Sequence, residues 1–447
     1  MRRDRADQGE ARCAASENSK AMTHPAQVTA GRVLIVVENL PVPFDRRVWS
    51  EATALKRAGY AVSVICPRAP GYETPEEIID GIYIYRHPLP FEARGAAGYL
   101  VEYPVALFWQ FVLSLKIAQR HGFDVIHACN PPDLIFFVAL LYKFLFGTQF
   151  LFDHHDANPE LYEAKFHRRD VFWKFLVLME KLTFKTADVS IATNDSYRNI
   201  AVTRGGMPPD RVFVVRSGPN LDRVRSVSPD LKWRNGRQFL VGYVGVIGQS
   251  EGLDLLLGSV DHIVRNRSRN DLQFVIVGSG PELQKIIQIC RYRKLDEYIT
   301  FTGRVDDTTL FTILSTADVC VNPDRVTPMN DISTMNKIME YMALGKPIVQ
   351  FDVTEGRYSA GDASLYAKPN DVVDFAEKIL ELIDHPQRRD AMGEFGLQRV
   401  RGTLAWEHEV PKLLSAYRTV FASSKKRSGI ANRLVASLTR HSNEPPQ

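Results

Sequence analysis

Short apolar runs that end in polar residues recur along most of the chain. The first, GRVLIVVENL at residues 31–40, is rich in β-branched residues and lacks helical spacing, so it predicts a strand buried on both faces. Val48, Ala52 and Leu55 then follow at helical spacing before Gly59, and YAVSVICP supplies a second strand. This strand, helix, strand order predicts the start of a parallel sheet.

The same alternation continues in two series. The first series adds predicted strands in FDVIHACNPPDL, TQFLFDHHDANPE, TADVSIATNDS and DRVFVVRSGPNL. The second runs through RQFLVGYVGVIG, DLQFVIVGSGP, YITFTGRV, ADVCVNPD, KPIVQFD and SLYAKP, and helical patterns follow from Val372 to Phe421. The expected fold class is therefore α/β, with two doubly wound Rossmann-like domains.

A polar stretch between the two series divides the chain. Residues 31–220 are predicted to form an N-terminal domain, and residues 237–421 a C-terminal domain with its terminal helices. Residues 221–236, rich in Arg, Ser and Pro, are the predicted linker. Residues 1–30 and 422–447 are polar and are predicted to be disordered tails, and the first of them lacks the apolar core of a secretory signal.

Composition narrows the class of protein. A chain of 447 residues with 45% hydrophobic and 24% charged residues suits two packed domains. A formal net charge of +4 is too small to indicate nucleic-acid binding without a dense basic patch. The five cysteines are scattered without a CxxC pair, which argues against a disulfide framework or zinc site and favours a cytoplasmic location. The longest apolar run, at residues 134–146, is too short to span a bilayer and is predicted to be a buried helix.

The segment DISTMNKIMEYMALGKP, residues 331–347, is the most informative for chemistry. Ser333 or Thr334 is predicted to cap a helix that ends near Gly345 and Pro347. Its buried stripe is expected to consist of Met335, Ile338, Met339 and Met342.

Three polar residues would then lie on one non-core face of that helix. Ser333, Lys337 and Glu340 follow each other at spacings of four and three residues. Free N–H groups at the helix start and Lys337 could neutralise a diphosphate, and Glu340 could accept hydrogen bonds from two ribose hydroxyls. Spacing alone favours the plainer interpretation, a solvated helix face that carries a Lys–Glu pair.

The order of GYVGVIGQSEGLDLLL, VIVGSGPE, FTGRV and KIMEYMALGKPIV resembles the donor domain of glycosyltransferase family 4, which comprises retaining enzymes of the GT-B fold. VENLPVPFDRRVWSEATALKRAGY and FDHHDANPELY resemble the same family, particularly a branch that builds bacterial cell-surface polysaccharides. The resemblance covers about residues 31–421. It implies a hexosyltransferase-like enzyme whose two domains face a central cleft and which moves a sugar from a nucleotide sugar to a glycan or lipid-linked acceptor.

The resemblance also assigns roles to residues of the site. It implies that His155 reaches the donor sugar, that Glu340 holds the donor ribose, and that Lys337 binds the diphosphate together with the backbone at Ser333 and Thr334. Arg304 and Val305 would lie near the base. The further donor-binding candidates are Gly248 and Gly278 in the glycine loops and Asp331.

Polar residues at strand ends of the N-terminal half are candidates for the acceptor side. The loop FDRR places Asp45, Arg46 and Arg47 at the end of the first strand, where they could grip a phosphate or carboxylate or could form a surface salt-bridge cluster. His127 follows another strand, although a histidine there is more often a packing residue.

A metal site is weighed at His154, His155 and Asp156, but no third ligand has a recognisable spacing, so a polar rim without metal is expected. No cofactor or metal is therefore predicted, since a lysine and helix N-termini can bind an anion without one.

The chain departs from the family pattern at three positions. Val246 and Glu251 stand where the family commonly has an arginine and a lysine. Ile332 stands where the family has a glutamate eight positions before Glu340, with Asp331 beside it as a candidate substitute.

Two other activities remain open from the sequence: a nucleotide-sugar epimerase on the same fold, and a non-catalytic nucleotide-sugar-binding protein, which the departures motivate. A dinucleotide-dependent oxidoreductase is disfavoured, because ENLPVPFD and not GxGxxG follows the first strand.

A membrane surface is a further predicted partner. The stretch HRRDVFWKFLVLMEKLTFK, residues 167–185, mixes aromatic and basic residues as interfacial helices do, which predicts peripheral binding at the inner face of the cell membrane. An ordinary core helix with basic ends fits the same pattern.

Overall fold

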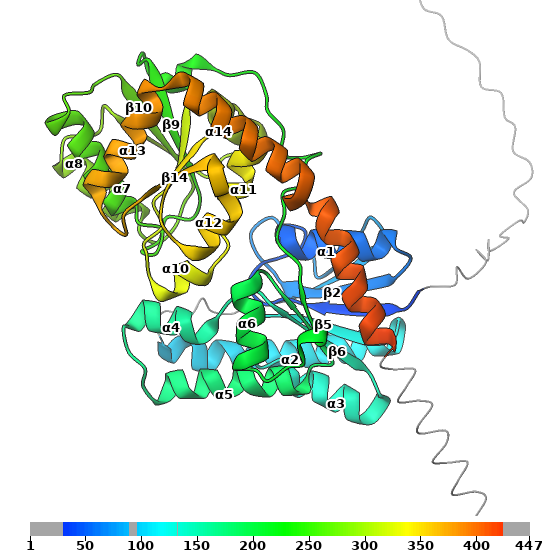
Figure 1. The fold of residues 1–447 in the computed structure, drawn as a ribbon. Helices are drawn as coiled ribbons and strands as arrows, with labels where there is room; N and C mark the ends of the chain where they lie inside the picture. Colours follow the sequence, from blue (N-terminus) through cyan, green and yellow to red (C-terminus); the bar gives the residue numbers. More distant parts are fainter. Residues whose placement is uncertain (1–29, 89–95, 132, 423–447) are drawn as a thin grey trace, which may run out of the picture.

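The computed structural model describes residues 30–88, 96–131 and 133–422, with side chains described outside residues 96–103. Apart from residues 30 and 422, the two predicted tails lie outside the described residues. Figure 1 shows two lobes, each built around its own sheet.

The first lobe contains a sheet of eight strands in the order β3-β4-β2-β1-β5-β6-β7-β8. Only β3 and β4 pair antiparallel, and the other neighbours are parallel. Its elements are β1 (Arg32–Val36), α1 (Arg46–Arg57), β2 (Ala61–Pro67), β3 (Glu76–Ile79), β4 (Ile82–His87), α2 (Ala96–Arg120), β5 (Val125–Cys129), α3 (Phe136–Phe146), β6 (Gln149–His154), α4 (Asn158–Phe166), α5 (Val171–Thr186), β7 (Val189–Ala192), α6 (Asp195–Thr203) and β8 (Val212–Val214).

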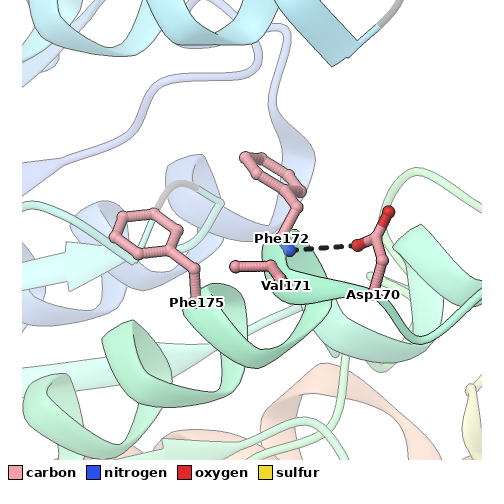
Figure 2. A pocket seen from close by; sticks show the side chains of 4 residues that line it. All are labelled: Asp170, Val171, Phe172 and Phe175. Atoms are coloured by element: carbon pink, nitrogen blue, oxygen red, sulfur yellow. Dashed lines mark hydrogen bonds between the residues drawn. The ribbon is translucent and has the colours of Figure 1, made fainter.

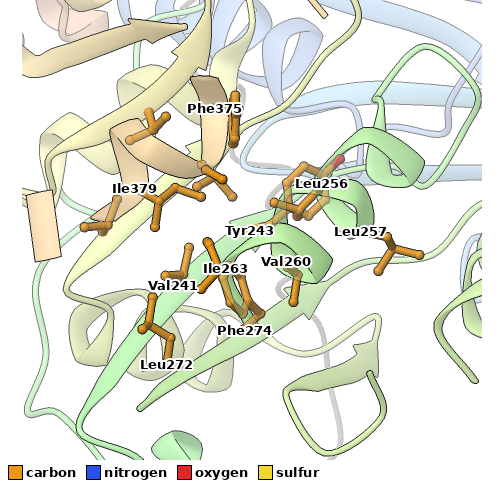
Figure 3. Packing of buried hydrophobic residues seen from close by; sticks show 14 of the residues in the cluster. Val241, Tyr243, Leu256, Leu257, Val260, Ile263, Leu272, Phe274, Phe375 and Ile379 are labelled. Carbon is orange, nitrogen blue, oxygen red and sulfur yellow. The ribbon is translucent and has the colours of Figure 1, made fainter. Parts of the chain in front are cut away.

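The second lobe contains a fully parallel sheet of six strands in the order β11-β10-β9-β12-β13-β14. Its elements are β9 (Phe239–Val244), α7 (Leu253–Asp261), β10 (Leu272–Val277), α8 (Leu283–Tyr292), β11 (Ile299–Gly303), α9 (Asp307–Thr316), β12 (Val319–Asn322), α10 (Pro328–Ile332), α11 (Asn336–Ala343), β13 (Ile348–Phe351), α12 (Thr354–Ala360), β14 (Ser364–Ala367), α13 (Val372–Asp384) and α14 (Pro386–Arg399). Figure 3 shows how one face of this sheet packs: Val241 and Phe274 from the strands meet Val260 of α7 and Ile379 of α13. Burial of such side chains is the main stabilising contribution to each lobe.

Every strand predicted from an apolar run is present. Most of these runs are buried within a parallel sheet, whereas the edge strands β8 and β11 are only partly buried. The hairpin of β3 and β4 was not predicted. Its first strand, EEII, alternates in burial at the edge of the sheet and so lacks a continuous apolar run.

The last helix, residues 406–422, corrects the predicted domain boundary. The prediction placed this helix with the second domain, but Leu413, Tyr417 and Val420 are buried in the core of the first lobe. In Figure 1 the chain passes from α14 on the second lobe into this helix, which lies along the first lobe. Part of the predicted linker packs on the second lobe, because Val224 is buried in the core of that lobe.

The prediction that residues 134–146 form a buried helix is half wrong. Helix α3 forms there, and Val138, Ala139 and Tyr142 pack against the sheet. The opposite face is exposed, with 85% of Phe144 and 71% of Phe146 accessible. Among the described residues, no helix combines the length and apolar character needed to cross a bilayer.

Candidate functional site

Helix α11 carries the two charged residues predicted to hold the donor. Ile338, Met339 and Met342 are buried as expected, so the helix presents its remaining face to the boundary between the lobes. The predicted cap is wrong: the helix begins at Asn336, and Met335 precedes it without a side-chain cap. The first N–H groups of α11 therefore carry no side-chain cap of their own.

Ser333 belongs to the preceding helix, where it is the C-cap residue of α10, and its hydroxyl donates to the carbonyl of Met329 over 2.7 Å. Ser333, Lys337 and Glu340 therefore do not share one helix, as the spacing had predicted. Lys337 Nζ lies 2.8 Å from Oδ1 of Asp324 and 4.8 Å from the ring of Tyr243. The ammonium group is thus held at the end of β12 by one buried carboxylate.

Glu340 pairs with two arginines, Arg46 of the first lobe and Arg223 of the segment that connects the lobes. Its Oε1 lies 3.2 Å from a guanidinium nitrogen of Arg46 and 3.4 Å from one of Arg223. The same two arginines pair with Asp307 at the start of α9. Because Arg46 comes from the first lobe, Glu340 lies where the two lobes meet.

The three charged residues of the loop after β1 differ in exposure and in their partners. Asp45 is the N-cap of α1 and accepts a hydrogen bond from the N–H of Val48 over 3.1 Å. Arg46 is 58% exposed and reaches Glu340, whereas Arg47 turns inward and is buried. Of the three residues predicted for the acceptor side, the structure leaves only Arg46 with an exposed charged group facing the second lobe.

His155 follows β6 and is linked to this loop. Its Nε2 lies 2.6 Å from Oδ2 of Asp153 and 2.7 Å from Nε of Arg47, and its backbone N–H donates to Oδ1 of Asn130. Arg46 and Arg47 are consecutive, so they connect Glu340 of the second lobe to His155 of the first.

The other two histidines lie in the interior. His127 is fully buried, with Nδ1 2.7 Å from the hydroxyl of Tyr417, so it does not line an accessible acceptor surface. His154 is fully buried among Phe184, Tyr197 and their neighbours, and burial lowers its pKa to about 3. Of the expected polar rim, His155 and Asp156 are partly exposed, whereas His154 is a neutral core residue.

The glycine loops of the second lobe pack directly on one another. Gly278 has φ of +139°, and a Cβ there would lie 1.8 Å from the carbonyl oxygen of Gly245, so only glycine fits. The N–H of Gly248 donates to Oε2 of Glu251 over 3.1 Å. Arg304 is exposed, and its guanidinium lies 5.8 Å from the ring of Phe44 on the first lobe.

Val305 is partly buried against the second lobe's core, next to Arg304. Contact of a donor with these loops, with Arg304 and with Val305 stays a prediction.

The structure places the departures from the family pattern in different surroundings. Val246 is exposed, and nothing in the structure explains it. Ile332 packs against the core of the first lobe, and its carbonyl accepts a hydrogen bond from Nδ2 of Asn194 over 2.8 Å. Asp331 accepts from the N–H and hydroxyl of Thr354 at the start of α12, so its carboxylate is already engaged. Glu251 is largely buried, which raises its pKa.

Several contacts between the lobes were not predicted. Asn194 also donates to Oγ1 of Thr334 over 3.0 Å, and the hydroxyl of Tyr197 lies 3.2 Å from that of Ser333. On the same side, Glu355 accepts from Ser196 and pairs with buried Arg216. Asn194 follows β7 directly. Because ligands and functional polar residues gather at the carboxyl ends of parallel strands, its position in the sequence could have identified it.

Comparisons with known proteins agree with this architecture. The family described as Glycosyltransferase Family 4 matches residues 45–223, and the family described as Glycosyl transferases group 1 matches residues 238–385. An uncharacterised glycosyltransferase of Methanocaldococcus jannaschii is 24% identical over 318 residues, which cover 67% of this chain and 73% of the relative. Alpha-D-kanosaminyltransferase of Streptomyces kanamyceticus is 27% identical over 157 residues, or 35% of this chain, and only 39% of its own length is matched.

Two solved structures share the fold. Sucrose-phosphate synthase from Thermosynechococcus elongatus superposes with a TM-score of 0.74 at 20% identity, covering 88% of this chain and 100% of that one. Anabaena HepE, solved with UDP and glucose, superposes with a TM-score of 0.66 at 14% identity, covering 87% and 99%. Two Rossmann-like lobes of this kind define the GT-B class of glycosyltransferases. With family matches in both lobes, the chain is a glycosyltransferase of the family 4 type.

Proposed function

We propose that this chain transfers a sugar, with retention of configuration, from a nucleotide sugar bound by the second lobe to an acceptor bound by the first. The main support is a pair of contacts made by consecutive residues: Arg46 contacts Glu340, and Arg47 contacts His155. It links a carboxylate of the second lobe, suited to ribose hydroxyls, with an imidazole of the first lobe, suited to a sugar. The first N–H groups of α11 provide positive potential for a diphosphate without a metal ion, and Lys337, whose ammonium group pairs with Asp324, lies in the first turn of the same helix.

A panel of nucleotide sugars tests this activity. We expect one donor to release its nucleoside diphosphate much faster when an acceptor extract is present than when it is absent. Interconversion of the donor's sugar without release would support an epimerase. Tight donor binding without turnover under any condition would support a non-catalytic binding protein.

We further propose that the acceptor is a lipid-linked glycan of a cell-surface polysaccharide and that the enzyme works at an anionic membrane surface. The support is an apolar face on the first lobe. Helices α3 and α5 lie side by side there, and their exposed apolar residues are Phe137, Leu140, Leu141, Phe144, Leu145, Phe146, Val171, Phe175 and Leu178. Exposed apolar residues gathered on adjacent helices are uncommon on a soluble monomer.

The end of α5 adds a hollow to this apolar face. Asp170, Val171, Phe172 and Phe175 line an open cavity of about 610 Å³, and Figure 2 shows the two phenylalanine rings beside Val171. Asp170 does not oppose binding to anionic lipid strongly, because it caps α5 and pairs with Arg168.

Basic residues accompany the apolar face. Lys174, Lys181 and Lys185 are exposed on α5, whereas Arg168 and Arg169 already pair with carboxylates. Apolar side chains beside exposed lysines are the combination that binds an anionic lipid surface without spanning it.

Vesicle flotation tests the membrane proposal with phosphatidylcholine vesicles that contain or lack phosphatidylglycerol. We expect binding to rise with phosphatidylglycerol and to weaken with salt. The variant Phe144→Gln/Phe146→Gln should bind less, as should replacement of Lys174, Lys181 and Lys185 by Gln. Tyr292→Gln is the matched control, because Tyr292 is 89% exposed on α8 of the second lobe. Equal partitioning of all variants would overturn the proposal, and concentration-dependent dimers lost in Phe144→Gln/Phe146→Gln would assign the face to self-association.

A further inference from the structure

Beneath His155, Arg47 contacts a group of interior side chains that the proposed mechanism does not use. The group consists of Glu51 from α1, His127 from β5 and Asp153 from β6, and none of these three side chains has accessible surface. The guanidinium of Arg47 lies 2.9 Å from Oδ1 of Asp153 and 3.1 Å from Oε1 of Glu51. Two carboxyl groups therefore share one guanidinium in the interior.

The charges of this group do not balance if both carboxyl groups are ionised. One guanidinium offsets one carboxylate, and a second buried charge without a partner costs several kcal/mol. His127 could supply a second positive charge, since its Nε2 lies 3.4 Å from Asp153 and 3.7 Å from Glu51. However, burial lowers the pKa of His127, despite the opposing effect of Asp153.

The two carboxyl groups differ in their hydrogen bonds, which indicates where the proton resides. Asp153 accepts from two nitrogens of Arg47 and lies 2.6 Å from Nε2 of His155. Burial alone would raise the pKa of Asp153, but Arg47 and the two histidines hold it well below its usual range. The carboxylate charge therefore belongs to Asp153.

Glu51 has the opposite environment. Neither of its oxygens accepts a well-directed hydrogen bond, and the nitrogen of Arg47 nearest to it donates to Asp153. Burial raises the pKa of Glu51 well above its usual range, and Asp153 and Asp45 act in the same direction against Arg47. Cys129 and the hydroxyl of Tyr417 face the same group and bring no positive charge.

We propose that Glu51 is held as a neutral carboxylic acid that donates its hydrogen to Asp153, and that this pair positions His155 in the site. The proton leaves one negative charge in the group, on Asp153, where it faces both Arg47 and Nε2 of His155. Glu51 and Asp153 are then positioning residues. The nearby guanidinium of Arg47 forms its ion pair with Asp153 and not with Glu51. Glu51, His127, Cys129 and Asp153 also place donor atoms within 4.8 Å of one another, as a metal site would, but the guanidinium of Arg47 already supplies the positive charge.

Infrared difference spectroscopy tests the protonation of Glu51 without any assay of activity. Wild type minus Glu51→Gln at pH 7.5 should show the C=O stretch of a protonated carboxylic acid, which is separate from carboxylate bands. A difference spectrum with only carboxylate bands would overturn the proposal. Because wild type supplies the signal, a reference variant Glu51→Met serves if Glu51→Gln folds poorly.

Kinetics test the positioning role, which rests on the proposed function. Glu51→Gln keeps a neutral hydrogen-bond donor, so we expect kcat within about threefold of wild type, whereas Asp153→Asn should lower kcat about tenfold or more with little change in donor KM. In a His155→Ala background, Asp153→Asn should cost almost nothing further. Additive effects of the two changes would overturn the positioning role. Failure of the proposed function is a distinct result, since wild type would then lack transfer while the infrared band persisted.

Discussion

Replacing Glu340 by glutamine tests the assignment of the donor site most directly. The change keeps the shape of the side chain but removes the charge that faces Arg46 and Arg223 at 3.2 and 3.4 Å. If Glu340 accepts hydrogen bonds from the donor ribose, losing the charge should cost about 1.5–3 kcal/mol of transition-state binding, because hydrogen bonds to a charged group are worth that much. The expected fall in kcat/KM is roughly 10- to 150-fold.

The fold should survive this change, because the buried stripe of α11 is formed by other residues. The measurement is kcat/KM with the true donor, alongside the thermal midpoint. Asp307→Asn is the matched control: Asp307 pairs with the same Arg223 and Arg46, at 2.6 and 3.4 Å, but lies on α9 and is not predicted to touch the donor. Asp307 is about half exposed, so its loss should cost less than about 1 kcal/mol of stability.

Two outcomes would refute the reasoning about Glu340. Wild-type kcat/KM in Glu340→Gln would remove it from the site. Equal losses in Glu340→Gln and Asp307→Asn would mean that both carboxylates act only by holding the arginines between the lobes.

Three further predictions concern metal, acid stability and the position of Ile332. Activity should survive excess EDTA, since Lys337 and the start of α11 take the place of a divalent ion; loss of turnover in chelator that magnesium or manganese restores would contradict this. His154 has a folded pKa of about 3 against 6.5 unfolded, so its stabilising contribution is complete above pH 6.5 and is lost as pH falls towards 3, by about 2 kcal/mol at pH 5. Denaturant unfolding at pH 7.5 and 5 should show a smaller pH effect in His154→Phe, and an unchanged effect would count against the assignment. Ile332→Glu should lower stability by about 1–2 kcal/mol, with Ile332→Leu nearly neutral in the same unfolding assay.

The sequence predicted the strands well because parallel strands in a lobe with helices on both faces of the sheet are buried on both sides and read as continuous apolar runs. Helix α3 shows where this rule fails. Its sequence is apolar all round, which normally indicates complete burial, yet Phe144 and Phe146 are exposed. Periodicity reports which residues can be buried, and only the packing of the whole lobe decides which are.

The candidate site divides in a similar way. Lys337, Glu340 and His155 were found from local pattern and family resemblance. The partners of these residues were not, because Arg46, Arg223 and Asp153 reach them from other elements. The predicted start of α11 was also wrong. Serine is a common N-cap residue, but Ser333 is the C-cap residue of α10.

The departure at Ile332 follows from the same break between helices. A spacing of eight residues suggests that positions 332 and 340 share the face of one helix, but α10 ends at Ile332 and α11 begins at Asn336. The intervening residues are extended, with ψ of 136° at Ser333 and 106° at Met335, so the two side chains take separate directions. Ile332 packs on the first lobe, while Glu340 meets the arginines. A glutamate at 332 would therefore place a charge against an apolar surface, whereas isoleucine packs on that surface and leaves the carboxylate at 340 in place.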